Sequence, residues 1–288
     1  MGALLNRRRY MGGGSTDEII MTTTTNPEVL AVLYAHGCCT SPDYMTKSEA
    51  EAVTSIGSGA NSWFRNNTSI THFEEFQYFC NIVLNPNIFE GCTALKTITM
   101  PSAVTVFPNN LFNGCEALET VTKNSITSIG QYCFRNCKAL TSYTFDVGLT
   151  TIGGAAFFFN QSITFTNDIP STVTSISNQA FQSTGHTGKL TIPSGITTVN
   201  QRLFQNSMCS EIVLPSTITS VDNFAFYGTS NLESMTIYAT TPPTIGSDVF
   251  SRFGKTGCVI YVPLGSVENY KTASGWSVVA DKIQAIPT

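Results

Sequence analysis

A phenylalanine recurs at nearly constant spacing through most of this 288-residue chain, with 22 to 24 residues between successive members. The series is Phe89, Phe112, Phe134, Phe157, Phe181, Phe204, Phe226 and Phe250. A unit of this length cannot bury its apolar side chains alone, so neighbouring units must stack and share a core. The spacing therefore predicts one elongated solenoid instead of separate globular domains.

Other positions of each unit keep the same phase. A small residue such as Ala156 precedes the phenylalanine, Gly or Asn often follows two residues later, and Leu often follows six residues later. Next comes an alternating stretch such as Leu190-Thr-Ile192, and several units continue with Pro-Ser. This alternation predicts a short strand with one buried face, and Pro-Ser predicts the turn that ends the strand. Each unit is therefore expected to form one coil, stacked on the next at about 4.8 Å.

The full pattern is Phe-x-Gly-Cys-x-x-Leu-x-x-Ile-x-x-Pro-x-x-Val-Thr-x-Ile, clearest from Phe89 to Val106 and from Phe181 to Val199. It resembles the BspA-like leucine-rich repeats of gut and oral anaerobes and their phages. The resemblance covers about residues 55 to 258, and residues 259 to 283 are similar to the closing segment of that family. It implies a β-rich α/β solenoid of leucine-rich repeats, with turns or 3₁₀ segments between the strands.

Both ends of such a stack need a cover, because the end coils expose apolar faces. One cap helix is expected to begin at Pro27 after Asn26, and another after the capping box from Thr46 to Glu49. The expected divisions are a flexible, basic, glycine-rich arm over 1–21, a helical cap over 22–54, the solenoid over 55–258 and a C-terminal cap over 259–288.

The arm contains Arg7, Arg8, Arg9 and Tyr10, followed by Met-Gly-Gly-Gly. It has too few apolar residues to form a core, so we interpret it as an anchor to a larger assembly. Its opening is similar to those of proteins encoded by gut phages, and an incidental basic tail is the alternative. Two leucines before three arginines reverse the order of a Sec signal peptide, so no such signal is predicted.

Composition and motifs argue against several classes of function. Charged residues make up 12% of the chain and the net charge is -4, so no nucleic-acid partner is expected. No apolar run approaches the roughly 18 residues of a membrane span. The chain lacks a nucleophile elbow, a Walker loop and a zinc motif, and the loop between the cap helices lacks calcium ligands. We therefore predict no catalytic residue, cofactor or metal site.

Cysteine and histidine both have structural interpretations. Cys92, Cys115 and Cys137 each lie three residues after a repeat phenylalanine, which places them in adjacent coils. We favour a ladder of reduced, buried thiols, and disulfides between neighbouring coils are the alternative. His186 lies in a loop that replaces the usual leucine, and we expect it at the surface.

The outward face of the predicted sheet is the candidate binding site. Ten residues after the phenylalanine stands a threonine in several units: Thr99, Thr122, Thr144, Thr191 and Thr236. These threonines form either a polar binding ridge or only cross-strand packing. A further patch is conceivable from residues whose mutual placement the sequence does not fix: Tyr143, Tyr227, Tyr238, Arg135, Arg202 and Arg252.

We accordingly expect a non-enzymatic scaffold that binds a protein or a cell-surface glycan. In one hypothesis the arm fixes the chain to virion proteins, and the repeats serve as a phage fibre, decoration or receptor-binding element. In the alternative, the chain is a BspA-like adhesin of a bacterial surface. The expected location is thus a virion or a cell surface, and the lack of a recognisable export signal favours the virion.

Overall fold

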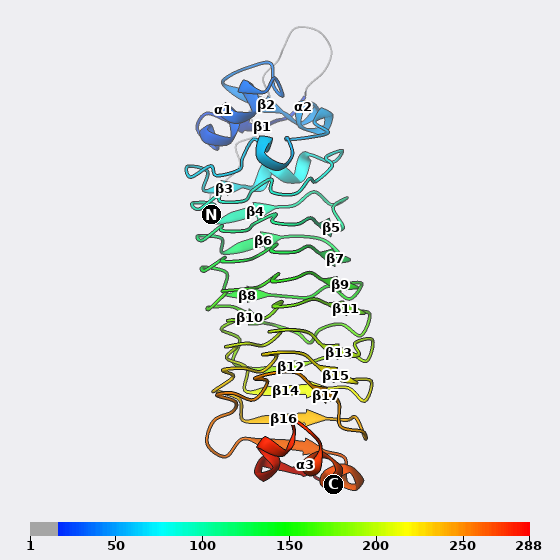
Figure 1. Cartoon of the computed structure of the whole chain (residues 1–288). Helices are drawn as coiled ribbons and strands as arrows, with labels where there is room; N and C mark the ends of the chain where they lie inside the picture. Colours follow the sequence, from blue (N-terminus) through cyan, green and yellow to red (C-terminus); the bar gives the residue numbers. More distant parts are fainter. Residues whose placement is uncertain (1–16) are drawn as a thin grey trace.

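The computed structural model describes residues 17–288 and shows a rod of stacked coils with a cap at each end (Figure 1). Two rows of short strands run along the rod. The first row consists of β3 (His72–Phe73), β4 (Thr97–Thr99), β6 (Thr120–Thr122), β8 (Ser142–Tyr143), β10 (Thr164–Phe165), β12 (Lys189–Thr191), β14 (Glu211–Leu214), β16 (Ser234–Ile237), β18 (Val259–Val262) and β19 (Ile283–Ala285). The second consists of β5 (Val106–Phe107), β7 (Ser128–Ile129), β9 (Thr151–Ile152), β11 (Ser175–Ile176), β13 (Thr198–Val199), β15 (Ser220–Val221) and β17 (Thr244–Ile245). The predicted β-rich solenoid is confirmed.

Neighbouring strands in each row are parallel and in register. Ile98 of β4 pairs with Val121 of β6, one repeat later. Equivalent side chains therefore lie side by side in successive coils. Among the described strands, backbone pairing in the first row is interrupted between β6 and β8 and between β10 and β12.

The second row was not predicted, because the sequence indicated one strand per coil. The Pro-Ser turn is confirmed: the N–H of Val173 donates to the carbonyl of Pro170 at 3.0 Å. Beyond the turn the chain alternates again, with Val173 and Ile176 buried and Thr174 exposed. This segment forms β11. Each coil therefore contributes one short strand to each of the two rows, and its third side has no strand.

The repeat phenylalanines form a continuous aromatic spine. Rings of adjacent coils are nearly parallel along the middle of the rod, with Phe134 and Phe157 5.5 Å apart at 7° and Phe204 and Phe226 5.7 Å apart at 5°. The rings from Phe89 to Phe226 are completely buried. The shared hydrophobic core predicted from their spacing is therefore confirmed.

The spine differs from the predicted series at its ends. Phe64 extends it at the N-terminal end, 5.7 Å from Phe89. At the other end Phe250 leaves the stack and packs 5.2 Å from Trp276 of the C-terminal cap, while Phe253 takes its place 6.4 Å from Phe226. The last coil is covered by the cap instead of by another coil, and this changes which ring faces inward.

The third side of each coil is a six-residue turn, and together these turns form what we name the turn face. They are residues 86–91, 109–114, 131–136, 154–159, 178–183, 201–206, 223–228 and 247–252, each with its repeat phenylalanine in fourth place. The second and sixth residues of every turn have positive φ, as at Asn110 (57°) and Gly114 (76°). This conformation directs the N–H of Gly114 to the carbonyl of Arg135 in the next coil at 2.8 Å. The need for left-handed backbone explains why Gly or Asn stands two residues after five of the eight phenylalanines.

The N-terminal cap consists of β1 (Ile19–Thr22), α1 (Pro27–Ala35), β2 (Tyr44–Thr46) and α2 (Lys47–Ala52), followed by the 3₁₀ turns η1 (Gly59–Asn61) and η2 (Glu74–Tyr78). Both predicted helices are present, and Thr46 and Glu49 form the capping box. Asn26 does not cap α1 with its side chain but donates to the carbonyl of His72 at 3.0 Å, which ties the cap to the first coil.

The predicted end of the arm at residue 21 is too late. Residues 19–22 form β1, antiparallel to β2, and Met21 is completely buried. Asp17 also hydrogen-bonds the hydroxyl of Ser48. The apolar Ile-Ile-Met stretch gains burial by pairing with β2, so it belongs to the cap.

The C-terminal cap continues the first row through β18 and β19 and covers the last coil with η3 (Leu264–Ser266), α3 (Val267–Thr272) and η4 (Ser277–Lys282). Tyr270 and Trp276 are completely buried against it. The Tyr270 hydroxyl donates to the carbonyl of Ala239 at 2.9 Å, and Nε1 of Trp276 donates to the carbonyl of Pro243 at 2.8 Å. Both rings thus cover the apolar end while their polar atoms satisfy carbonyls of the last loop.

His186 is not a surface residue, contrary to the prediction. It is 4% exposed and bridges the interruption between β10 and β12. Its Nδ1 accepts from the N–H of Phe165 at 3.2 Å, so Nε2 holds the proton and donates to the carbonyl of Lys189 at 3.2 Å. The imidazole thus takes the place of the backbone hydrogen bonds that are missing between these two strands, and its ring packs 5.2 Å from that of Phe165.

Replacing His186 by alanine is expected to lower the free energy of unfolding by about 1–3 kcal/mol, because the buried N–H of Phe165 loses its acceptor. Urea unfolding of the two proteins measures the loss. His36→Ala is the matched control and should cost less stability, since His36 is exposed and its ring stacks on Trp63 instead of bridging two strands. Equal stabilities for His186→Ala and the parent would contradict the bridging role.

Candidate functional site

The predicted threonine ridge lies on the outward side of the first strand row. Each of the five side chains is exposed or half-buried, while the residues beside them in the strands, such as Ile98 and Leu190, are buried. Thr99 pairs with Thr122 across β4 and β6. The structure therefore places these threonines where a partner has access to them.

The ridge is divided into separate segments. Val213, which is 7% exposed, stands between Thr191 and Thr236 in the register of β12, β14 and β16. Thr144 hydrogen-bonds the hydroxyl of Thr166 in the next coil. Between β6 and β8 an ion pair of Lys123 with Asp146 replaces strand pairing. The threonines thus offer short polar segments and not one continuous row.

The laddered cysteines satisfy backbone carbonyls inside the coils. Sγ of Cys92 donates to the carbonyl of Phe64 at 2.9 Å, and Sγ of Cys115 donates to the carbonyl of Phe89 at 3.0 Å. Burial raises the pKa of Cys115 and Cys137 well above the ordinary thiol value. All nine cysteines lie in the described part of the chain and are free thiols there. The ladder has a structural role, and its thiols are shielded from reagents.

The turn face presents arginines stacked on aromatic rings. The guanidinium of Arg202 lies 5.3 Å from the ring centroid of Phe224, and that of Arg252 lies 5.9 Å from Tyr227. The rings of Phe224 and Tyr227 are 5.9 Å apart. These four side chains therefore form one continuous cluster over three successive turns.

A second cluster lies further toward the N-terminus on the same face. Arg135 lies 5.4 Å from the ring of Tyr132 and 5.6 Å from that of Phe158. Phe158 also packs 4.4 Å from Phe159, which is 43% exposed. The three arginines of the suggested patch thus share one face, whereas Tyr143 is buried below the first strand row and Tyr238 follows β16.

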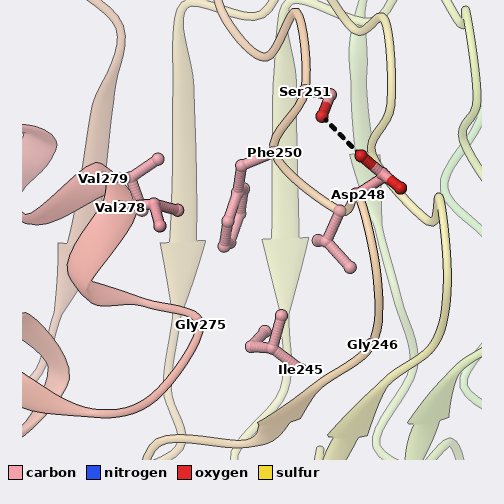
Figure 2. A pocket seen from close by; sticks show the side chains of 9 residues that line it. Ile245, Gly246, Asp248, Phe250, Ser251, Gly275, Val278 and Val279 are labelled. Atoms are coloured by element: carbon pink, nitrogen blue, oxygen red, sulfur yellow. Dashed lines mark hydrogen bonds between the residues drawn. The ribbon is translucent and has the colours of Figure 1, made fainter.

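A shallow cavity of about 370 Å³ lies between the last turn and the C-terminal cap (Figure 2). Ile245, Phe250 and Val278 line it together with Asp248 and Ser251. The Ser251 hydroxyl donates to the Asp248 carboxylate at 3.1 Å. This pair is exposed and joins two residues of the same turn, three positions apart, so we interpret it as a turn contact and assign the cavity no reaction.

Two further features of the described residues bear on function. Within residues 17–288 no cluster of three or more His, Cys, Asp or Glu side chains is placed to hold a metal ion. Every helix in that part of the chain is too short or too polar to cross a bilayer. Arg7, Arg8, Arg9 and Tyr10 lie outside the described residues.

Comparison with known proteins agrees with the architecture. The family model of the BspA-type leucine-rich repeat region matches residues 54–184 and 158–270, with six copies of the repeat. The chain belongs to the BspA-type leucine-rich repeat family. No curated protein matches the sequence significantly.

Several solved leucine-rich repeat proteins are similar to this BspA-type chain. One from Bacteroides ovatus is 20% identical, with a TM-score of 0.40, over 74% of this chain and 71% of that one. TpLRR from T. pallidum is 18% identical, with a TM-score of 0.43, over 64% and 72%. A leucine-rich cell surface protein from Faecalibacterium prausnitzii is 21% identical, with a TM-score of 0.38, over 82% and 80%.

Sequence reasoning on this BspA-type repeat did not single out the turn face. Tyr132, Arg202 and Phe224 occupy the second place of their turns, where Asn87 and Asn110 stand in earlier coils. A side chain in left-handed backbone at that place points along the outside of the rod. The sequence does contain aromatic and arginine residues at one repeat position, which could have indicated an exposed cluster. The turn geometry was needed to recognise that these residues lie on one face.

Proposed function

We propose that this protein is a non-enzymatic repeat scaffold that binds a protein or a cell-surface glycan through its exposed faces. The supporting observation is the aromatic spine, which fixes successive coils at about 4.8 Å and so holds equivalent exposed side chains in rigid rows. Such a surface binds through many contacts of preset geometry, which lowers the entropic cost of association. Thr99, Thr122, Thr144, Thr191 and Thr236 are candidate contact residues on the first strand row.

We further propose that residues 1–21 include the segment that attaches the scaffold to a larger assembly such as a phage virion. Three adjacent arginines followed by glycines favour an extended basic segment that binds an acidic surface of another protein. There the repeats would serve as a fibre, decoration or receptor-binding element. The alternative is an adhesin on a bacterial surface, which membership of the BspA-type family favours.

Deleting residues 1–16 tests the anchoring proposal, because the deletion stops before Asp17 and β1. We expect the truncated chain to lose co-sedimentation with purified particles and to keep its melting temperature. Arg7→Ala, Arg8→Ala and Arg9→Ala together form the milder variant and should weaken attachment. Recovery of the full chain in the cell envelope, with none on particles, would instead support the adhesin. A large fall in melting temperature would show that the segment belongs to the fold.

A further inference from the structure

We propose that the turn face from 131–136 to 247–252 binds an acidic polysaccharide through its uronic acid carboxylates. This inference rests on the proposed binding function and names both the surface and the class of ligand. It follows from the charge, the spacing and the ring content of one side of the rod.

Aromatic rings hold the arginines of this surface in place, but no carboxylate neutralises their charge. Arg135, Arg202 and Arg252 each stand over an aromatic ring, and none of them forms an ion pair with a carboxylate among residues 17–288. Arg65, by contrast, pairs with Glu90 at 2.8 Å at the other end of the rod. A guanidinium stacked on a ring keeps its edge N–H groups free, and their fork matches the two oxygens of a carboxylate.

The local charge of this surface opposes that of the whole chain. The six turns of the surface contain three arginines and a single carboxylate, that of Asp248, although the net charge of the chain is -4. Arg135, Arg202 and Arg252 lie in the first, fourth and sixth turns of the proposed surface. At about 4.8 Å per coil they stand about 14 and 24 Å along the rod from the first arginine. Cations spaced along the rod in this way suit an extended anionic chain lying parallel to the rod axis.

The side chains between the arginines favour a sugar over an acidic peptide. Phe158, Phe159 and Tyr227 offer flat ring surfaces, and Gln205 offers a partly exposed amide. Gln182 is buried, and its amide accepts from Gln179 and donates to Gln205. A pyranose ring has C–H groups on its faces and hydroxyl groups around its rim, so rings and amides complement it together. An acidic peptide would pair with the arginines but would present no flat C–H face to the three rings.

The backbone supports a role for the aromatic residues beyond folding. Tyr132, Phe159 and Phe224 have φ of 56°, 63° and 60°, a conformation unfavourable for bulky side chains. The same turn places hold Asn110 and Asn136 in other coils. Strained residues of this kind concentrate at functional sites, and here they form the edge of the arginine clusters.

Three soluble polymers test the proposal by isothermal titration: polygalacturonate, its methyl ester and polyglutamate. The first variant combines Arg135→Gln, Arg202→Gln and Arg252→Asn. These replacements copy residues that the chain has at the same turn places, namely Gln182, Gln179 and Asn136. We expect the variant to bind polygalacturonate at least tenfold more weakly than the parent, and the methyl ester to bind the parent at least tenfold more weakly than polygalacturonate.

Phe224→Asn removes an aromatic ring of the proposed surface at a place where asparagine tolerates the left-handed backbone, so it tests binding without a loss of stability. We expect severalfold weaker binding of polygalacturonate with an unchanged or higher melting temperature. The matched control is Thr120→Ser, an exposed residue of β6 on the first strand row, which should bind as the parent does.

Several results would overturn the inference. Absence of polygalacturonate binding, or binding that the arginine variant leaves unchanged, would show that the ligand class or the surface is wrong. Equal binding of polyglutamate, lost in the same variant, would assign the surface to an acidic peptide. None of these results overturns the scaffold proposal, because attachment to particles or cells is measured separately with the chain truncated at residue 16.

Discussion

Replacing Phe157 by alanine is expected to lower the free energy of unfolding by about 3–5 kcal/mol. Its ring is completely buried and lies between Phe134 at 5.5 Å and Phe181 at 6.1 Å, each at 7°. Tyr143 and Phe165 also pack on it, at 5.0 and 5.3 Å. The variant opens a cavity in the middle of a stack whose coils contact only their neighbours, so both adjacent interfaces weaken. Urea unfolding followed by circular dichroism measures the change.

Phe159→Asn is the matched control for that variant, two residues away in the same turn. Phe159 is 43% exposed and its φ of 63° is one that asparagine tolerates well, as at Asn136 and Asn206. We expect its stability to be unchanged or about 1 kcal/mol higher. If both variants lost stability equally, the spine would not be the main source of stability.

Raising the pH above about 9 is expected to destabilise the fold steeply. Burial raises the pKa of Cys115, Cys133 and Cys137 well above the ordinary thiol value of 9.0, and that of Cys209 to about 12. A thiol is neutral when protonated, so the unfolded chain loses these protons first and binds fewer of them than the folded chain. The stabilisation is complete below pH 9.0 and declines between that value and the folded pKa.

The expected loss is about 1.4 kcal/mol per pH unit for each thiol, and therefore roughly 5 kcal/mol per pH unit for the four together. Urea unfolding in the presence of a phosphine reductant, from about pH 7 to about pH 10, measures the slope. The upper limit keeps most of the tyrosine contribution out of the measurement, because Tyr143, whose pKa burial also raises, adds to the slope only above the ordinary tyrosine value of 10.0.

Cys133→Ala is the control for the alkaline slope. Ala156, Ala180 and Ala225 occupy the equivalent place before the phenylalanine in other coils, so alanine fits there. The variant should retain most of its stability at neutral pH. Its free energy of unfolding should fall less steeply with pH, by about 1.4 kcal/mol per pH unit, because one buried thiol is gone. A slope identical to that of the parent would show that the buried thiols do not govern alkaline unfolding.

Proposed binding surfaces were less accessible to sequence reasoning than the fold. The outward placement of Thr122 and Thr144 followed from strand alternation alone. Their separation into short segments depends on Val213 and on the Lys123–Asp146 ion pair, which arise from contacts between coils. The clustering of Arg202 with Phe224 depends on left-handed turn backbone, which directs both side chains along the rod.

The sequence by itself determined the period, the phenylalanine spine, the Gly and Asn places in the turns and the capping box at Thr46, because each depends on local conformation or on a pattern repeated many times. Tertiary structure alone decided that Phe253 replaces Phe250 at the end of the spine, that His186 bridges β10 and β12, and that the arginines meet aromatic rings on one face. The first two features occur once each, at an end and at an interruption of the repeat, and the third depends on turn side chains that differ from coil to coil. There the neighbouring coil or cap, and not the repeat itself, determines which side chain fills the space.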